Sequence, residues 1–207
     1  KMLLGQETPT SGTFLLDGKP FPEEPGIERG IVFQRYSVFP HLTVLGNVMM
    51  SMEMKESKFF GKFFGTKRKE AKKTAMEMLA SVGLGDAADK YPSELSGGMQ
   101  QRLSIAQSLV NKPKILLLDE PFGALDPGIR ADMHKLILDL WEKNNLTIVM
   151  VTHDLKESFY LGTRLLVFDK VRYEPQAPNM YGALITYDIP VGDTREAVLK
   201  EVEESIN

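Results

Sequence analysis

The stretch LSGGMQQRLSIAQSLVNKPKILLLDE, residues 95–120, predicts a helix followed by a buried strand that ends in two carboxylates. Ser96 is a favoured N-cap residue, and Gly97 and Gly98 leave space beside the first-turn N–H groups because they have no Cβ. A helix start of this kind attracts anions. The stretch therefore predicts a phosphate-binding helix start.

The predicted helix has an apolar side and a polar side. Its apolar residues recur at helical spacing: Leu103, Ile105, Ala106 and Leu109. We expect its polar residues to be open to solvent or to a partner: Gln100, Gln101, Arg102 and Gln107. Pro113 ends the helix.

Residues 115–118 are four aliphatic residues without alternation, which is typical of a central parallel strand covered on both faces. Asp119 and Glu120 then lie at the carboxyl end of this strand, where open α/β sheets bind ligands. One carboxylate can hold Mg²⁺, and the other can orient or deprotonate a water. The alternative is a solvated acidic pair that merely ends the strand. The Ser-Gly-Gly helix start favours the functional interpretation.

Five motifs in this chain resemble those of the ATP-binding cassette (ABC) ATPases. LSGGMQQR resembles their signature motif, and ILLLDEP resembles their Walker B strand. GALD at 123–126 is similar to the D-loop, Thr152-His153-Asp154 to the switch-histidine loop, and Gln34 in IVFQ to the Q-loop. Because the five motifs follow the order of that family, the chain is identified as a member of it.

The resemblance implies a role for each site residue, with ATP and Mg²⁺ as cofactors. Its catalytic residues would be Gln34, Glu120, which polarises the attacking water, and His153, which senses the γ-phosphate. Asp119 and Gln34 would hold Mg²⁺. The nucleotide, held by the P-loop of one copy, would meet a second copy through Ser96, Gly97, Gly98, Gln101 and Asp126.

The resemblance also implies an α/β, P-loop NTPase-like fold, with a largely parallel core sheet, an antiparallel β portion and a helical subdomain insertion. We expect one domain over residues 1–207, with the helical subdomain at about 36–110 and a C-terminal tail at 171–207. The family's Walker A motif, GxxGxGKS or GxxGxGKT, does not occur in these residues. We therefore expect the N-terminal strand and P-loop to lie upstream, and residues 1–207 alone to lack ATPase activity.

Composition limits the class of protein. A net charge of −3 gives no reason to expect nucleic acid, and no apolar run has membrane-spanning length. The absence of cysteine excludes disulfides and fits a cytosolic location. The resemblance then implies a homodimer at the cytoplasmic face of the inner membrane. Its partners would be transmembrane permease subunits, docked on Tyr36–Leu42, and indirectly a solute-binding protein.

Further elements follow from local patterns. Asp17-Gly18 closes a predicted hairpin whose first strand is 13–16, and Thr43 caps a helix. Asp126 caps a helix that begins with Pro127. The other predicted helices are 69–82, 155–161 and 194–206, and the other predicted strands are 31–33, 146–151, 164–168 and 183–187. The basic cluster Lys67-Arg68-Lys69 favours a solvated helix face over an adaptable surface near the membrane subunits.

Two longer segments, PTSGTFLLDGKP and VFQRYSVFPHLTVLGNV, resemble the importer ATPases for nitrate, sulfonates and taurine. The resemblance implies uptake of a small nitrogen or sulfur compound. The alternative, if the chain truly lacks Walker A, is a non-hydrolysing dimerisation or regulatory module.

Overall fold

The computed structural model describes residues 2–22, 24, 26–34, 37–56, 62–170 and 182–192. The chain divides into two compact units, residues 1–151 and residues 152–207, which are described separately. Tyr36 and the predicted helix 194–206 lie outside the described residues. The predicted helical subdomain and tail boundaries stay predictions.

The first unit contains a parallel sheet of three strands, β3 (Arg29–Val32), β4 (Ile115–Asp119) and β5 (Thr147–Val151), with β4 in the centre. Three of the four aliphatic residues at 115–118 are buried, which confirms the predicted central strand. Asp119 is the register partner of Val151, so the carboxyl ends of β4 and β5 lie at the same edge. The predicted α/β class with a parallel core sheet is therefore confirmed.

β5 differs from β4 in its exposure. Among the described strands β5 pairs with β4 alone, so it lies at an edge of the described sheet. Its residues alternate in burial, with Val149 38% and Val151 59% exposed. A largely aliphatic sequence therefore forms the edge strand of the described sheet, because aliphatic content predicts what a strand can bury and not how many neighbours it has.

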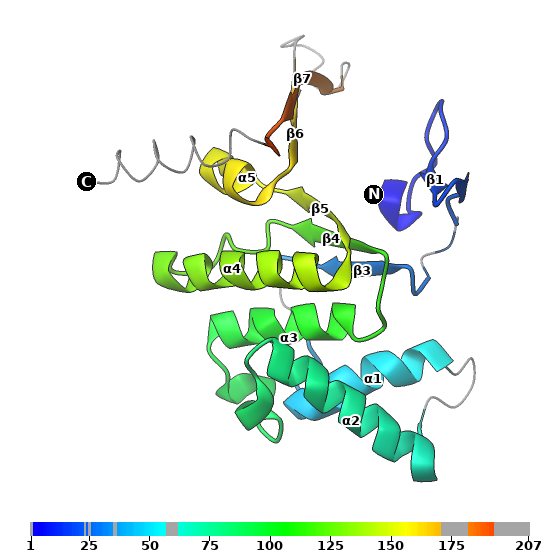
Figure 1. Ribbon diagram of the computed structural model, residues 1–207, viewed down its shortest axis with the longest axis vertical. Helices are drawn as coiled ribbons and strands as arrows, with labels where there is room; N and C mark the ends of the chain where they lie inside the picture. The colour runs from blue at the N-terminus through cyan, green and yellow to red at the C-terminus, as the bar shows by residue number, and fades with distance from the viewer. Residues whose placement is uncertain are drawn as a thin grey trace, which may run out of the picture. The chain divides into compact units, whose positions relative to one another are not determined.

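Three helices of the first unit pack together on one side of β3. They are α1 (Val44–Glu56), α2 (Gly65–Ser81) and α3 (Gly97–Leu109), and α3 contacts β3 while α1 and α2 pack on α3 (Figure 1). Two 3₁₀ turns, Gly85–Ala87 and Pro92–Glu94, connect α2 to α3. Thr43 Oγ1 accepts a hydrogen bond from Gly46 N at 3.1 Å, so the predicted cap of α1 is confirmed.

α2 begins four residues before the predicted start at Lys69. Phe64 at the N-cap makes no side-chain capping bond, so the usual start signal is missing. The inner side of α2 buries Ala71, Ala75 and Leu79 as the helical spacing predicts.

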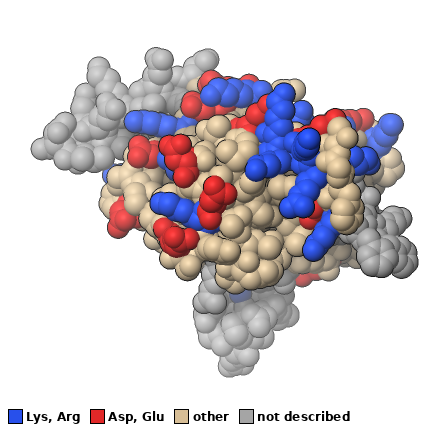
Figure 2. All heavy atoms as spheres, turned by 90° about the horizontal axis from the view of Figure 1, so that it is seen from below, with Lys and Arg blue, Asp and Glu red and all other residues tan. Residues whose placement is uncertain are grey.

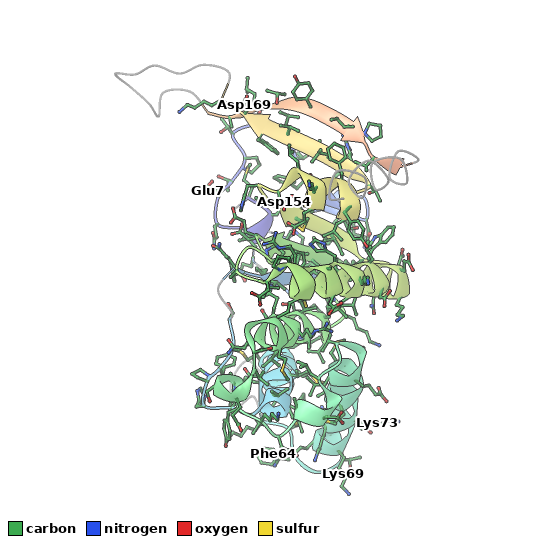
Figure 3. The ribbon with its side chains drawn as sticks, turned by 90° about the vertical axis from the view of Figure 1, so that its left-hand side faces the viewer. Glu7, Phe64, Lys69, Lys73, Asp154 and Asp169 are labelled. Carbon is green, nitrogen blue, oxygen red and sulfur yellow. The ribbon has the colours of Figure 1, made fainter. Side chains whose placement is uncertain are left out.

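The basic cluster of α2 lies on its outer face. Lys67, Arg68 and Lys69 are exposed, which confirms the predicted solvated face. In the view from below, most of the visible Lys and Arg side chains lie toward the right, with Asp and Glu side chains among them (Figure 2). Lys69 and Lys73 point away from the helix bundle (Figure 3).

The N-terminal segment of the first unit holds a 3₁₀ turn, Met2–Leu4, and a short hairpin of β1 (Leu15–Leu16) and β2 (Lys19–Pro20). Asp17 and Gly18 both have positive φ, at 52° and 75°, as a two-residue type I′ turn requires. The predicted hairpin is therefore confirmed.

Arg29, at the start of β3, fastens this segment to the sheet. Its side chain is fully buried, and its guanidinium donates to the backbone carbonyls of Leu3 at 3.1 Å, of Glu24 at 3.0 Å, and of Pro22. Its Nε donates to Glu28 Oε1 at 2.9 Å, and its Cζ lies 4.3 Å from the centre of the Phe21 ring. One cation therefore satisfies carbonyls from two separate stretches of chain.

Glu28 adds a pH-dependent part to this anchor. Burial raises the pKa of its carboxyl, but hydrogen bonds from the N–H groups of Glu28 and Gly26, and from Arg29, hold the pKa below its usual range. A carboxyl whose pKa is lowered by folding stabilises the fold above its unfolded pKa. That contribution is lost as the pH falls through the lowered pKa.

α4 (Pro127–Asn144) begins at Pro127 as predicted, but the Asp126 side chain makes no capping hydrogen bond, so the predicted side-chain cap is wrong. The helix buries Met133, Leu136, Ile137 and Leu140. The second unit contains α5 (Leu155–Leu161) and an antiparallel pair of β6 (Arg164–Asp169) and β7 (Leu184–Pro190), which confirms the predicted antiparallel β portion. In this pair Arg164 Nη2 donates to Asp188 Oδ2 at 2.6 Å, and this hydrogen bond lowers the pKa of the Asp188 carboxyl. Within the described ranges no helix is long and apolar enough to cross a bilayer.

Candidate functional site

Gln34 and Glu120, which lie 86 residues apart in the chain, meet at the carboxyl edge of the parallel sheet. Gln34 follows β3 and Glu120 follows β4, and Gln34 Nε2 donates to Glu120 Oε2 at 3.4 Å. Gln34 is exposed and Glu120 is half-buried. The structure therefore brings together two of the three residues predicted to be catalytic, because parallel neighbours end at the same edge.

The backbone of Glu120 adopts a conformation that side chains rarely accept. Its φ is +43°, in the left-handed region, while its N–H donates to Val151 O at 2.9 Å. A non-glycine residue held in this region costs of order 1–3 kcal/mol and is typical of functional sites. The turn directs the Glu120 carboxylate toward Gln34 instead of continuing the alternation of β4.

The loop after Glu120 lies against this pair. A Cβ built on Gly123 would lie 3.7 Å from Gln34 Nε2 and 4.0 Å from Glu120 Oε2. The backbone of Gly123 therefore lies close to the Gln34 and Glu120 side chains, with no side chain of its own between them. The loop ends at Asp126, which is exposed at the start of α4 and makes no capping hydrogen bond with its carboxylate.

Asp119, the last residue of β4, is also exposed at this edge. Among the described residues no group of three or more His, Asp or Glu side chains could hold a metal ion by itself. Protein sites for Mg²⁺ commonly supply one or two carboxylates and leave the other positions to phosphates and water. The carboxylate of Asp119 and the amide oxygen of Gln34 fit such a sparse donor set.

The second half of the predicted site is the start of α3. Ser96 is the N-cap, its Oγ accepts from Met99 N at 3.4 Å, and both Ser96 and Gly97 are exposed. The predicted cap is confirmed. The first-turn N–H groups of α3 therefore begin at the surface of the first unit, where an anion can approach them.

Gly98 was predicted to leave space for a nucleotide at the start of α3, but the structure gives it a packing role. It is buried, and a Cβ at this position would lie 2.5 Å from Ile129 Cγ2. The missing side chain therefore lets the start of α3 approach α4 closely, whereas Gly97 is the glycine that remains open.

The prediction that Gln101 lies on the open, polar side of α3 is wrong. Its side chain is fully buried, so it is not open to solvent and presents no group to a nucleotide at the surface. The reason is helical spacing: Gln101 lies three residues after Gly98 and four before Ile105, both of which are buried. Within the described structure neither amide atom of Gln101 has a hydrogen-bond partner.

This burial gives a prediction for stability. An unsatisfied buried amide costs about 1–3 kcal/mol, so we expect Gln101→Leu to raise the free energy of unfolding by about 1 kcal/mol. Urea unfolding followed by the fluorescence of Trp141, the single tryptophan, measures it. Gln100→Leu is the matched control and should lower stability, because Gln100 Nε2 donates to Pro92 O at 2.9 Å. An equal loss in both variants would contradict the prediction.

His153 belongs to the second unit and is exposed. It follows β5 by two residues, and Val151, the last residue of β5, is the register partner of Asp119. Asp154 caps α5 by accepting from Glu157 N at 3.2 Å. The predicted role of His153 therefore stays a prediction.

Sequence reasoning missed two residues that hold the first unit together, Arg29 and Asn47. Asn47 is a fully buried amide in the first turn of α1. A lone Asn inside the apolar run VLGNVMM was the available signal, since a buried amide requires partners.

Comparison with known proteins agrees with this geometry. The family model described as "ABC transporter" matches residues 1–123. The nitrate import ATP-binding protein NrtD of Synechocystis is 43% identical over 81% of this chain and 59% of its own length. The taurine import ATP-binding protein TauB of Rhizobium johnstonii is 42% identical over 76% of this chain and 56% of its own. This chain thus spans less than three fifths of either relative.

Among solved structures, the chain is similar to the ATP-binding cassette MJ0796 in a dimeric post-hydrolysis state bound to ADP and phosphate. The TM-score is 0.66 at 27% identity, with 92% of this chain and 79% of that chain covered. The fold predicted from the five motifs is therefore confirmed. On these matches, the chain belongs to the ABC transporter family of ATP-binding proteins.

Proposed function

We propose that this chain is part of the ATP-hydrolysing subunit of an ABC importer that takes up a small solute. The observation that carries the proposal is the meeting of Gln34 and Glu120 at the carboxyl edge of the sheet, with Asp119 exposed beside them. Membership of the family and the names of the relatives support it. These names favour an importer ATPase over a non-hydrolysing regulatory module.

The residues at the carboxyl edge of the parallel sheet would have different roles in ATP hydrolysis, which follow from their side-chain chemistry. Asp119 and Gln34 would hold Mg²⁺, which, when bound, neutralises charge on the phosphate oxygens. Glu120 accepts a proton from the attacking water, and Gln34 Nε2, 3.4 Å from Glu120 Oε2, orients the same carboxylate. His153 would hydrogen-bond the γ-phosphate, and Asp126 would connect the two sites across a dimer.

The start of α3 would serve the nucleotide of a second copy. Ser96 and Gly97 are exposed at an N-terminus whose N–H groups favour an anion, and both belong to the same surface-exposed turn. A dimer in which each copy supplies this turn to the other fits the dimeric state of the similar MJ0796 structure. Gln101 is left out of this contact because it is buried.

The proposal places the protein at the cytoplasmic face of the inner membrane, peripheral to transmembrane permease subunits. The docking surface would include the described part of the predicted segment, residues 37–42, in which Phe39 and Leu42 are half-buried and His41 is exposed. A solute-binding protein would act through the permease. The relatives named for nitrate and taurine import support a small nitrogen or sulfur compound as the solute.

A charge substitution at Ser96 tests the dimer that the proposal requires. Asp and Asn are both good N-cap residues, so Ser96→Asp and Ser96→Asn keep α3 capped and differ only in charge. We expect Ser96→Asp to weaken dimerisation of the full-length protein with a non-hydrolysable ATP analogue by at least about tenfold, because a carboxylate repels phosphate. Ser96→Asn should dimerise nearly as the parent does.

Sedimentation velocity with and without the nucleotide measures both variants. Dimerisation of Ser96→Asp at the parent's level would contradict the proposed contact. A parent that neither dimerises with nucleotide nor hydrolyses ATP would refute the function itself.

A further inference from the structure

The fully buried side chain of Asn47 binds the loop of residues 37–43 to α1. Asn47 Oδ1 accepts from Phe39 N at 2.7 Å, and Nδ2 donates to the carbonyls of Phe39 at 3.0 Å, Leu42 at 3.1 Å and Thr43 at 2.9 Å. One amide therefore satisfies both ends of this short loop. Thr43 O and Phe39 O also accept from the backbone N–H groups of Asn47 and Leu42, so the bonds to Phe39 N and Leu42 O are the ones whose loss would leave a polar group unpaired.

Gln107 joins the same amide to α3. Its Nε2 donates to Asn47 Oδ1 at 3.2 Å, across 60 residues of sequence. Asn47 Oδ1 thus accepts from the loop and from α3 at once, so the loop and α3 share one buried acceptor. A displacement of the loop changes the bond that holds α3, and the reverse also holds.

The neighbour of Gln107 extends the connection to the sheet. Ser108 Oγ donates to Ile31 O at 2.6 Å, in the strand that leads to Gln34. The space between α3 and β3 is tight, since a Cβ on Gly30 would lie 3.0 Å from Ser108 O. α3 therefore contacts Asn47, the α1 residue that holds the loop, through Gln107, and it contacts the sheet through Ser108. Its opposite end is the exposed cap Ser96.

From these contacts we propose that Asn47 and Gln107 are positioning residues, which couple the loop of residues 37–43 to the nucleotide-facing start of α3. The inference rests on the proposed function, in which this loop lies on the permease-docking surface. A permease that moves the loop then moves α3 as a rigid element, and with it Ser96. By linkage, closure on nucleotide at Ser96 changes the affinity for the permease by the same factor.

The test uses the full-length protein, alone and assembled with its membrane subunits. Gln107→Leu removes the donor to Asn47 and keeps a similar volume. We expect its ATPase activity without the membrane subunits to stay within about twofold of the parent, while stimulation by them falls about two- to thirtyfold. The unstimulated rate survives because neither residue touches the Gln34 and Glu120 edge.

Asn111→Leu is the matched control. Asn111 Nδ2 donates to Ser51 O at 2.9 Å, so it also ties the end of α3 to α1, but it does not reach the loop. It should keep full stimulation. Unchanged stimulation in Gln107→Leu, or an equal loss in Asn111→Leu, would overturn the inference. A parent without ATPase activity would instead refute the proposed function.

Hydrogen exchange at the Phe39 amide gives a readout that does not depend on transport. Asn47→Ala removes the acceptor of the Phe39 N–H, and we expect exchange there to become at least about tenfold faster, while the amides of β4 keep the parent's rates. Equal exchange in Asn47→Ala and the parent would show that Asn47 does not hold the loop, and it would overturn the inference whatever the ATPase rates are.

Discussion

Replacing Glu120 by Gln in the full-length protein is expected to lower kcat for ATP hydrolysis by a factor of about 10²–10⁴, the usual contribution of a positioned general base. The amide keeps the shape of the side chain and its place beside Gln34 at the carboxyl edge. It cannot accept the proton of the attacking water. ATP binding should therefore stay close to the parent's, and nucleotide-bound dimers should accumulate because they no longer turn over.

Single-turnover hydrolysis and nucleotide binding, measured on the same preparation, separate these two effects. Glu142→Gln, on the exposed side of α4, is the matched control and should retain the parent's activity. Undiminished hydrolysis in Glu120→Gln would refute the role of Glu120. A parallel loss of binding and turnover would assign Glu120 to folding or nucleotide affinity instead.

Replacing Arg29 by Met is expected to destabilise the first unit by about 3 kcal/mol, because breaking a buried ion pair on one side leaves its partners unsatisfied. The carbonyls of Leu3, Pro22 and Glu24 would lose the Arg29 donor, and the Glu28 carboxylate would lose one of its donors and its paired charge. For a chain of this size the loss corresponds to roughly 10 °C in Tm.

Urea and thermal unfolding, followed by Trp141 in α4, report the change in the first unit. Arg29→Lys keeps the charge but not the planar fork, so it should recover only part of the stability. Lys114→Met is the matched control, since the ion pair of Lys114 with Asp17 is more than half exposed and exposed pairs contribute little. Equal stability of Arg29→Met and the parent would show that the anchor is dispensable.

Some features of the site could be predicted from sequence because their cause is local. An aliphatic run followed by Asp119 and Glu120 determines which end of a strand carries the acids, and parallel pairing then places Gln34 at the same edge. The cap of α3 and the hairpin turn at Asp17 and Gly18 likewise depend on a few neighbouring residues. These predictions are confirmed.

Other features depend on contacts between distant segments. Residue type predicted an open Gln101, but the close approach of α4 at Gly98 buries that side of α3. The partners of Asn47 lie up to 60 residues away, and those of Arg29 lie in a 3₁₀ turn and in the loop before β3. No periodicity along one helix or strand contains that information, so these residues become visible only when the chain is folded.

The edge of β5 that pairs with no described strand determines where another segment can bind to this sheet. Its N–H and C=O groups on that side, next to the exposed Val149 and Val151, form a template on which another extended chain can add. Among the described strands this margin is therefore where a further strand can extend the sheet, whether that strand comes from this protein or from another copy.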